Sequence, residues 1–308
     1  MKKIIPIFFA IDKNYVPFFT VSLTSLKENR NREKNYRIHV LYTSLENSDK
    51  EKILKMEEKG FSISLCDVSN KVKEIFSSLS LRDYYTISTY YRIFIPEIFL
   101  CYDKAIYLDS DTVINYDISS LYSVDLKDNF IAGVRDGAVK NIETFREYTK
   151  KTLGIPSSKY FNAGVIVMNL KEMRKQKFLD KFLTLSKLYT FAVAQDQDYL
   201  NVLCYRKTVI LEDDWNAMPI DKNHPSPKLI HFNLTAKPWH YKGIPYERYF
   251  WQYAMKTDYY EYLLSLRNDY SEQHKERDKS CEKTLIEMCR NEIANEHNYY
   301  NTYGRIFN

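Results

Sequence analysis

Short apolar segments alternate with helix-like segments along this chain of 308 residues, and this alternation restricts its fold more than any other feature. In the first third the order is strand, helix, strand, helix, strand, over residues 4–11, 16–26, 37–42, 48–59 and 61–65. Ser48 is the expected N-cap of the second helix. A helix at 89–99 and an apolar strand at 104–108 follow. The alternation predicts an α/β fold with a mixed, mostly parallel sheet flanked by helices.

The rest of the chain divides into a continuation of this pattern and a different C-terminal part. The predicted elements are strands at 130–134 and 161–168, a helix at 195–205 and a loop at 219–227. A single helix crowded with aromatic residues is predicted at 246–266, and a polar stretch begins at Asp269. We therefore expect a main domain over 1–242 and a helical extension over 243–308. The aromatic helix fits two situations: packing on the main domain, or lying on a membrane surface.

Composition excludes several classes of protein. The net charge is only +5, from 45 basic and 40 acidic residues, so the chain lacks the dense positive charge of a nucleic-acid binder. Apolar residues make up 44% of the chain, which is enough for a sizeable core. The chain has 7 glycines and contains neither GxGxxG nor GxxxxGK[ST], so neither a Rossmann nor a P-loop phosphate site is indicated.

The cysteines and the N-terminal segment bear on the compartment. The five cysteines are widely spaced and form no CxxC pair, so we expect a reducing, cytosolic compartment and neither disulfides nor a zinc cluster. The longest apolar run, residues 4–11, is much shorter than the roughly 20 residues of a membrane span. Asp12 and Lys13 follow it where a signal peptide would carry small residues, so a buried first strand is expected.

The sharpest chemical feature is the sequence Asp109-Ser110-Asp111, directly after the apolar strand at 104–108. The carboxyl ends of strands are where open α/β sheets bind their ligands. In a turn, the two carboxylates can converge on one hard cation, which would neutralise a diphosphate without a glycine-rich loop. The structural alternative is an ordinary solvated turn, since Asp and Ser are common turn residues.

Two later residues fit the same site. His231 follows an apolar triplet, and an imidazole beside two carboxylates suits Mn²⁺ better than Mg²⁺. Lys237 is a point charge that would balance a departing phosphate. Taken singly, each has an ordinary explanation as a strand-end histidine or a surface lysine.

Seven short segments resemble, in the same order, those of glycosyltransferase family 8. This is the retaining, metal-dependent group that includes bacterial lipooligosaccharide galactosyltransferases and glycogenin. The resemblance runs from about residue 3 to residue 242 and implies a GT-A type nucleotide-diphospho-sugar transferase fold. It is carried by FAIDKNY at 9–15, YYR at 90–92, YLDSD at 107–111, YFNAGV at 160–165, QDQD at 195–198, WN at 215–216, and HF at 231–232 with AKPW at 236–239.

The resemblance implies roles for individual residues. Mn²⁺ would be held by Asp109, Asp111 and His231. The nucleotide end of a UDP-sugar would be bound by Ala10, Ile11, Asp12, Asn14, Tyr15 and Ser110. Catalysis and sugar binding would involve Arg92, Asn162, Asp196, Gln197 and Lys237, with Asp136 contacting hydroxyl groups of the donor or the acceptor.

The implied activity is transfer of a hexose, glucose or galactose, from a UDP-sugar to a saccharide or lipid-linked glycan in bacterial surface polysaccharide or lipopolysaccharide synthesis. Gln197 is a poor nucleophile, so same-face attack by the acceptor is favoured over double displacement through Asp196. The implied setting is the cytoplasm; peripheral contact with the inner face of the membrane and a homodimer are left open.

One departure from the family matters. The family usually has a glycine three residues after the metal-binding histidine, and here the residue is Leu234. Glycine lets the backbone approach phosphate closely, so Leu234 is expected either to shift this loop or to weaken donor binding.

Three other functions compete with this interpretation. The sequence 108–113 also matches the first motif of haloacid-dehalogenase-like phosphatases, with Asp213 and Asp214 as their late acidic pair, although that motif normally opens the fold. A non-catalytic nucleotide-sugar-binding relative is suggested only by Leu234. A metal-dependent nucleotidyltransferase shares the carboxylate chemistry but would release pyrophosphate rather than UDP.

Overall fold

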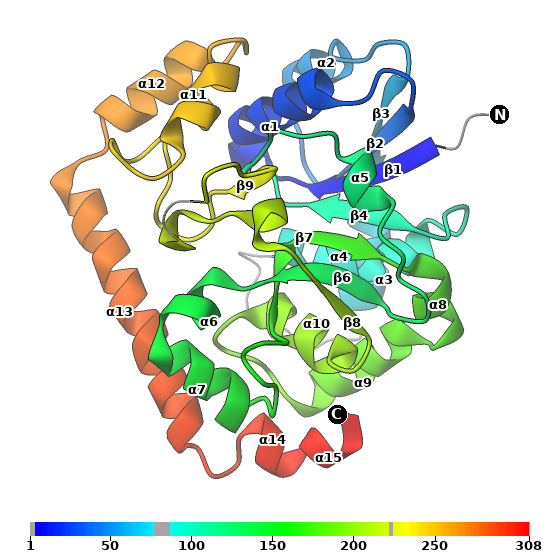
Figure 1. Ribbon diagram of the computed structural model, residues 1–308, viewed down its shortest axis with the longest axis vertical. Coiled ribbons are helices and arrows are strands. Elements are labelled where there is room, and N and C mark those ends of the chain that lie inside the picture. Colours follow the sequence, from blue (N-terminus) through cyan, green and yellow to red (C-terminus); the bar gives the residue numbers. More distant parts are fainter. Residues whose placement is uncertain (1–3, 77–86, 222–223, 308) are drawn as a thin grey trace.

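The apolar segments form a seven-stranded sheet, which runs through the middle of the molecule in Figure 1. The computed structural model describes residues 4–76, 87–221 and 224–307. The strands are β1 (Ile4–Ala10), β2 (Asn35–Tyr42), β3 (Phe61–Asp67), β4 (Ala105–Leu108), β6 (Ile131–Arg135), β7 (Phe161–Met168) and β8 (Thr208–Leu211). Their order is β3-β2-β1-β4-β7-β6-β8, and β7 alone among these strands is antiparallel to its neighbours. The predicted mostly parallel α/β sheet is confirmed.

Helices cover both faces of this sheet because alternate strand residues point to opposite sides. Phe8 of β1 belongs to a buried cluster with Phe94, whereas Phe9 packs edge-to-face on Phe19 of the opposite layer, with ring centroids 5.1 Å apart. The helices of this part are α1 (Val16–Asn29), α2 (Asn47–Leu54), α3 (Ser69–Phe76), α4 (Ile87–Ile98), α5 (Ser119–Tyr122), α6 (Gly137–Asn141), α7 (Glu143–Lys151), α8 (Leu170–Lys175), α9 (Phe178–Leu188) and α10 (Gln195–Cys204).

Two details of the predicted helices are wrong. Helix α2 begins at Asn47 with Glu46 at the N-cap, so Ser48 lies inside the helix, which ends at Leu54 rather than residue 59. The aromatic segment 246–266 is two helices, α11 (Glu247–Ala254) and α12 (Tyr260–Asn268). The break follows Ala254, whose carbonyl accepts from both the N–H and the hydroxyl of Thr257, at 3.0 and 2.8 Å. A side chain that bonds a nearby carbonyl in this way competes with the helical hydrogen bonds.

A second, two-stranded sheet was not predicted. It pairs β5 (Thr112–Ile114) with β9 (Leu229–His231) in antiparallel register, with Thr112 opposite His231. Both strands are fully buried and only three residues long. The pairing joins segments more than a hundred residues apart in the sequence, and it places the residue before β5 beside the end of β9.

The C-terminal part packs closely on the rest of the chain. Phe250 and Tyr253 of α11 and Leu263 of α12 are buried in a cluster with Phe18 and Trp239, as the packing alternative predicts. The long helix α13 (Glu272–Ala294) then runs along one side of the molecule to α14 (Tyr299–Thr302) and α15 (Gly304–Phe307) (Figure 1). The predicted helical extension is confirmed, while the domain boundary at 242 and 243 stays a prediction.

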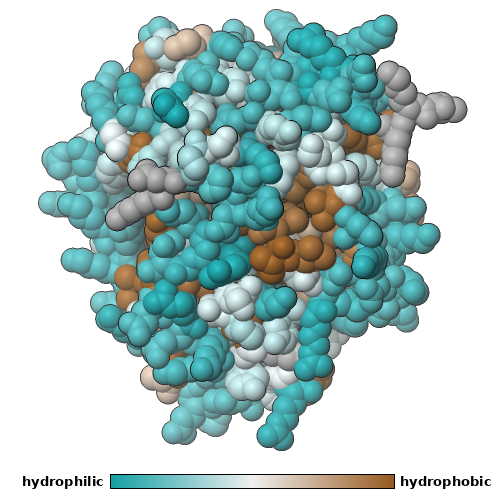
Figure 2. Space-filling view, viewed as in Figure 1, coloured by the Kyte–Doolittle hydropathy of each residue, from teal (hydrophilic) through white to brown (hydrophobic). Residues whose placement is uncertain are grey.

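The surface shown in Figure 2 is mostly hydrophilic, and the hydrophobic residues visible there lie mainly near the middle of the view. Among the described residues, no helix combines the length and the apolar character that crossing a membrane requires.

Candidate functional site

The site begins where two parallel strands end side by side. Phe9 of β1 is paired with Leu108 of β4, so the residues that follow each strand meet at one edge of the sheet. They line a cavity of about 190 Å³. Its walls include many predicted residues: Ala10, Ile11, Asp12, Tyr15, Arg92, Asp109, Ser110 and Asp111. Asn14 lies outside this lining, and its N–H donates to the carboxylate of Asp12 at 2.7 Å.

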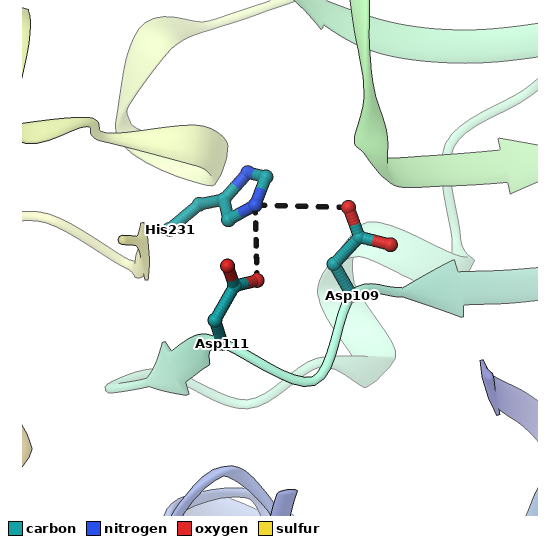
Figure 3. A group of neighbouring side chains, drawn as sticks. All are labelled: Asp109, Asp111 and His231. Atoms are coloured by element: carbon teal, nitrogen blue, oxygen red, sulfur yellow. Dashed lines mark ion pairs between the residues drawn. The ribbon is translucent and has the colours of Figure 1, made fainter. Parts of the chain in front are cut away.

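Asp109, Asp111 and His231 converge at this edge (Figure 3). Nε2 of His231 lies 3.2 Å from Oδ1 of Asp111 and 3.7 Å from Oδ2 of Asp109. One ligand atom from each residue lies within 4.8 Å of the others, which is a spacing that a single cation can bridge. Nδ1 of His231 is buried and has no hydrogen-bond partner in the described structure, so Nε2 is the ring nitrogen that faces the two carboxylates.

The backbone explains why these three side chains meet. The Asp109 N–H donates to the carbonyl of Gly164 on β7 at 2.7 Å, and the Phe232 N–H donates to the carbonyl of Asp111 at 3.0 Å. Gly164 leaves room for the group, because a Cβ atom there would lie 2.2 Å from Cε1 of His231 and 2.5 Å from Oδ2 of Asp109. Asp109 and His231 can therefore approach each other only because residue 164 is a glycine.

Lys237 supplies positive charge beside the same group. Its Nζ lies 2.5 Å from Oδ2 of Asp111 and also donates to the carbonyl of Phe232. Burial alone would raise the pKa of Asp111, but Lys237 and His231 outweigh it and hold that pKa well below its usual range. Asp111 is thus a carboxylate at neutral pH, as a metal ligand must be.

Arg92 connects this group to a second buried carboxylate. Its guanidinium lies 3.2 Å from Asp109 and 3.0 Å from Asp196, and it stacks over the ring of Tyr107 at 4.5 Å. Burial raises the pKa of Asp196 to about 6, with Arg92 opposing that effect. The Arg92 Nε–H is already donated to the carbonyl of Thr89, so its contact with Asp196 is an ion pair rather than a hydrogen bond.

A larger cavity of about 520 Å³ adjoins the first, and Arg92, Asp109 and Asp111 line both. Its other walls include the remaining predicted residues: Asp136, Asn162, Asp196, Gln197, His231 and Lys237.

Gln197 is fixed inside this cavity by hydrogen bonds. Its Oε1 accepts from the N–H of Ala163 at 2.9 Å and from Nδ2 of Asn162 at 3.2 Å. Its Nε2 donates to Asp136 at 3.3 Å and to the Tyr160 hydroxyl at 3.2 Å. The amide is held in one orientation, and Asp136 also accepts from Asn162 at 3.0 Å.

Several residues that support the site were given no role by the sequence analysis. Asp198 accepts from the hydroxyls of Tyr148 and Tyr160 at 2.8 and 2.7 Å and from the Ala194 N–H at 2.9 Å. Asn216 donates to Asn162 at 3.1 Å. Asp198 and Asn216 belong to recognised motifs, and their complete burial is the property that the sequence could not display.

Leu234 keeps the backbone conformation that a glycine would adopt. Its φ is +54°, in the left-handed region, and its side chain is 50% exposed and lines the larger cavity. The left-handed geometry is therefore retained at the cost of some backbone strain.

The acidic pair required by the phosphatase alternative is engaged elsewhere. Asp213 lies 3.0 Å from Lys140, and Asp214 lies 2.7 Å from Lys228. Neither lines the two cavities that contain Asp109.

The sequence and the structure of the chain are both similar to those of known glycosyltransferases. The chain is 28% identical to lipopolysaccharide 1,2-glucosyltransferase of Escherichia coli (strain K12) over 254 residues, which is 75% of this chain and 72% of that protein. Its structure resembles that of the galactosyltransferase LgtC in complex with donor and acceptor sugar analogs (TM-score 0.67, 25% identity, 82% of this chain and 96% of that one). It also resembles the bifunctional glycosyltransferase WbbM (TM-score 0.77, 25% identity, 87% of this chain and 52% of that one).

These structures confirm the GT-A type fold. The sequence model of glycosyl transferase family 8 matches residues 6–243, more than three quarters of the chain. The chain therefore belongs to glycosyltransferase family 8 and is a sugar-transferring enzyme.

Proposed function

We propose that this enzyme transfers a hexose, glucose or galactose, from a UDP-sugar to a saccharide or lipid-linked glycan acceptor, with retention of configuration and with Mn²⁺. The observation that carries the proposal is the convergence of Asp109, Asp111 and His231 beside Lys237, at the edge shared by two cavities. The smaller cavity suits the nucleotide, and the larger one suits the transferred sugar and the acceptor.

The donor set fits the metal. Two carboxylates and one imidazole are the combination that suits Mn²⁺, and their ligand atoms are already close together. When bound, the ion would supply positive charge for the diphosphate leaving group. Asp12 and Tyr15 lie at the nucleotide cavity, next to the end of β1.

The chain's own cations support departure of UDP. Negative charge develops on the diphosphate as the bond to the anomeric carbon breaks, and preorganised positive charge in a dry site stabilises it strongly. Lys237 is 8% exposed and already within 2.5 Å of Asp111, so its ammonium group is fixed before the donor binds. Arg92 is fixed in the same way between Asp109 and Asp196.

The carboxylates near the sugar cavity are all engaged, which favours same-face attack by the acceptor over a covalent intermediate. Asp196 pairs with Arg92, and Asp136 accepts hydrogen bonds from Val139, Asn162 and Gln197. Gln197 is an amide and a poor nucleophile. In same-face attack, the departing phosphate accepts the proton of the acceptor hydroxyl. Isolation of a sugar covalently bound to Asp196 would contradict this mechanism.

The surroundings of the reaction are part of the proposal. All five cysteines are free, which supports a reducing, cytoplasmic setting. Similarity to a lipopolysaccharide glucosyltransferase supports an acceptor in bacterial surface glycan synthesis, for which peripheral contact with the inner face of the membrane would be useful. Homodimer formation stays a separate proposal.

The test is UDP release from a panel of UDP-sugars, with Mn²⁺ or with EDTA. We expect slow hydrolysis of one UDP-hexose that requires Mn²⁺ and falls at least 100-fold in Asp109→Asn and Asp111→Asn. UDP binding measured on the same samples separates the outcomes. Binding without turnover would support the non-catalytic relative, and absence of UDP binding would overturn the proposed function.

A further inference from the structure

Lys237, the lysine proposed to meet the diphosphate, lies in a segment that is contacted by residues beyond the family match, which ends at residue 243. We call this segment, which follows His231 and includes Lys237, the 232–241 loop. On its inner side, Trp239 stacks on Phe18 with ring centroids 4.0 Å apart. On its outer side it meets α13, which begins after the family match ends at residue 243.

Three contacts join the 232–241 loop to the first half of α13 and to Tyr270, just before that helix. The Tyr241 hydroxyl donates to Asp278 at 2.7 Å, and the Thr235 hydroxyl donates to Glu282. His240 stacks on Tyr270, the residue before the N-cap of α13, with ring centroids 4.0 Å apart and planes 9° apart. Tyr270 in turn donates to the same carboxylate of Asp278 at 2.8 Å.

The contacting residues lie on one stripe of α13. Asp278 and Glu282 are four residues apart and so share a face of the helix, and His274, which stacks on Tyr270, lies on the same face. The same stripe continues through Leu285, which lines the larger cavity, to Cys289, which is completely buried. The first half of the stripe is polar and faces the 232–241 loop, whereas the second half is apolar and packs into the core against α7.

We propose that Asp278 and Glu282 are positioning residues, which hold the 232–241 loop so that Lys237 is in place when the donor diphosphate binds. Asp278 and Glu282, which line neither cavity, would then influence donor affinity without touching the donor. The expected effect on donor affinity rests on the proposed function, whereas the stabilisation of the 232–241 loop by α13 can be tested separately.

The same helix offers a matched control. Glu292, near the other end of α13, also accepts from a tyrosine hydroxyl, that of Tyr189 at 2.8 Å, but this contact anchors the helix far from the 232–241 loop. Substitution of Glu292 therefore removes a tyrosine–carboxylate hydrogen bond like that of Tyr241 with Asp278, but leaves the contacts of the 232–241 loop intact. The test compares the double variant Asp278→Ala/Glu282→Ala with Glu292→Ala.

Two measurements are made on the full-length variants. Amide hydrogen exchange of the ligand-free protein should become faster in residues 232–241 of the double variant, and in Glu292→Ala only around residues 189–191. UDP binding with Mn²⁺ should weaken about tenfold in the double variant, and by less than about twofold in Glu292→Ala. With a turnover assay, KM for the UDP-sugar should rise while kcat changes little, and Asp278→Asn should recover part of the lost affinity.

Two results would overturn the inference. One is unchanged exchange of the 232–241 loop in the double variant. The other is an equal loss of UDP affinity in Glu292→Ala, which would assign α13 a role in stability alone. If the wild-type protein bound no UDP, the proposed function would fail, and the exchange measurement would still decide whether α13 holds the loop.

Discussion

Gly164 shows how a single position can decide whether the metal group forms. A Cβ atom at this position would overlap His231 and Asp109. We expect Gly164→Ala to lose at least 100-fold in Mn²⁺ affinity, measured by calorimetric titration, while the circular dichroism spectrum keeps its α/β form.

Gly243→Ala is the control for this change. Gly243 has a φ of +77°, and a Cβ atom added there would have no neighbouring atom within 4 Å. Alanine at this position should therefore cost about 1 kcal/mol of stability and leave Mn²⁺ affinity unchanged. Retention of Mn²⁺ binding by Gly164→Ala would show that Asp109 and His231 do not hold the ion in this arrangement.

At Leu234, in contrast to Gly243, we expect a substitution to increase stability. Its left-handed backbone is strained for leucine, and its half-exposed side chain loses little burial on removal. We expect Leu234→Gly to raise the free energy of unfolding by about 0.5 kcal/mol in urea titrations, after the entropy cost of glycine is counted. Lys177→Gly, at an exposed position with φ of +53°, should behave similarly. A loss of more than about 1 kcal/mol at Leu234 alone would mean that its side chain stabilises the fold.

Asp198 makes stability depend on pH. Burial raises its pKa to about 6, although the hydroxyls of Tyr148 and Tyr160 oppose that effect. A carboxyl whose pKa is raised by folding contributes stability below its unfolded pKa, near 3.8, and loses it as the pH rises through 6. Relative to the wild type, Asp198→Asn should gain on the order of 2 kcal/mol between about pH 4 and pH 7, measured by urea unfolding. A difference that stays constant with pH would contradict this assignment.

At the scale of elements, the small β5–β9 sheet does more to position the site than its length suggests. The Thr112 hydroxyl donates to the Asp109 carbonyl at 2.8 Å and lies 2.9 Å from the Ser22 hydroxyl. Thr112→Val keeps the shape but removes both bonds, so we expect a loss of about 1–2 kcal/mol and weaker Mn²⁺ binding. Ser120→Ala, on the short helix α5, is a control that should leave Mn²⁺ affinity unchanged. Equal Mn²⁺ affinity in Thr112→Val would show that the turn is held by the backbone alone.

The elements that periodicity could predict are those with long local patterns. The strand at 161–168 and the helix near 195–205 follow from apolar runs and spacing, and they occur almost as expected. The β5–β9 pair could not be predicted, because three-residue strands carry no periodic signal and pair across a long separation. The break after Ala254 was missed because a local hydroxyl contact, rather than a glycine or proline, ends that helix.

At the scale of the whole molecule, the site draws on segments from every third of the chain. The motifs could be recognised in order, yet their meeting depends on pairings that only the fold reveals, such as His231 opposite Thr112. The contacts of the C-terminal extension could not be predicted from its composition, since a polar helix that packs through a narrow stripe has nearly the same composition as a fully solvated helix. Packing of α13 on both the 232–241 loop and α7 makes this extension part of the site's framework.

The central claim is that Asp109, Asp111 and His231 hold Mn²⁺ together with UDP. The most direct measurement is titration of Mn²⁺ into the wild-type protein and into Asp111→Asn, followed by electron paramagnetic resonance, with and without UDP. We predict one bound ion per chain, tighter binding when UDP is present, and loss of that ion in Asp111→Asn. Equal Mn²⁺ binding by both proteins, or no effect of UDP, would contradict the claim.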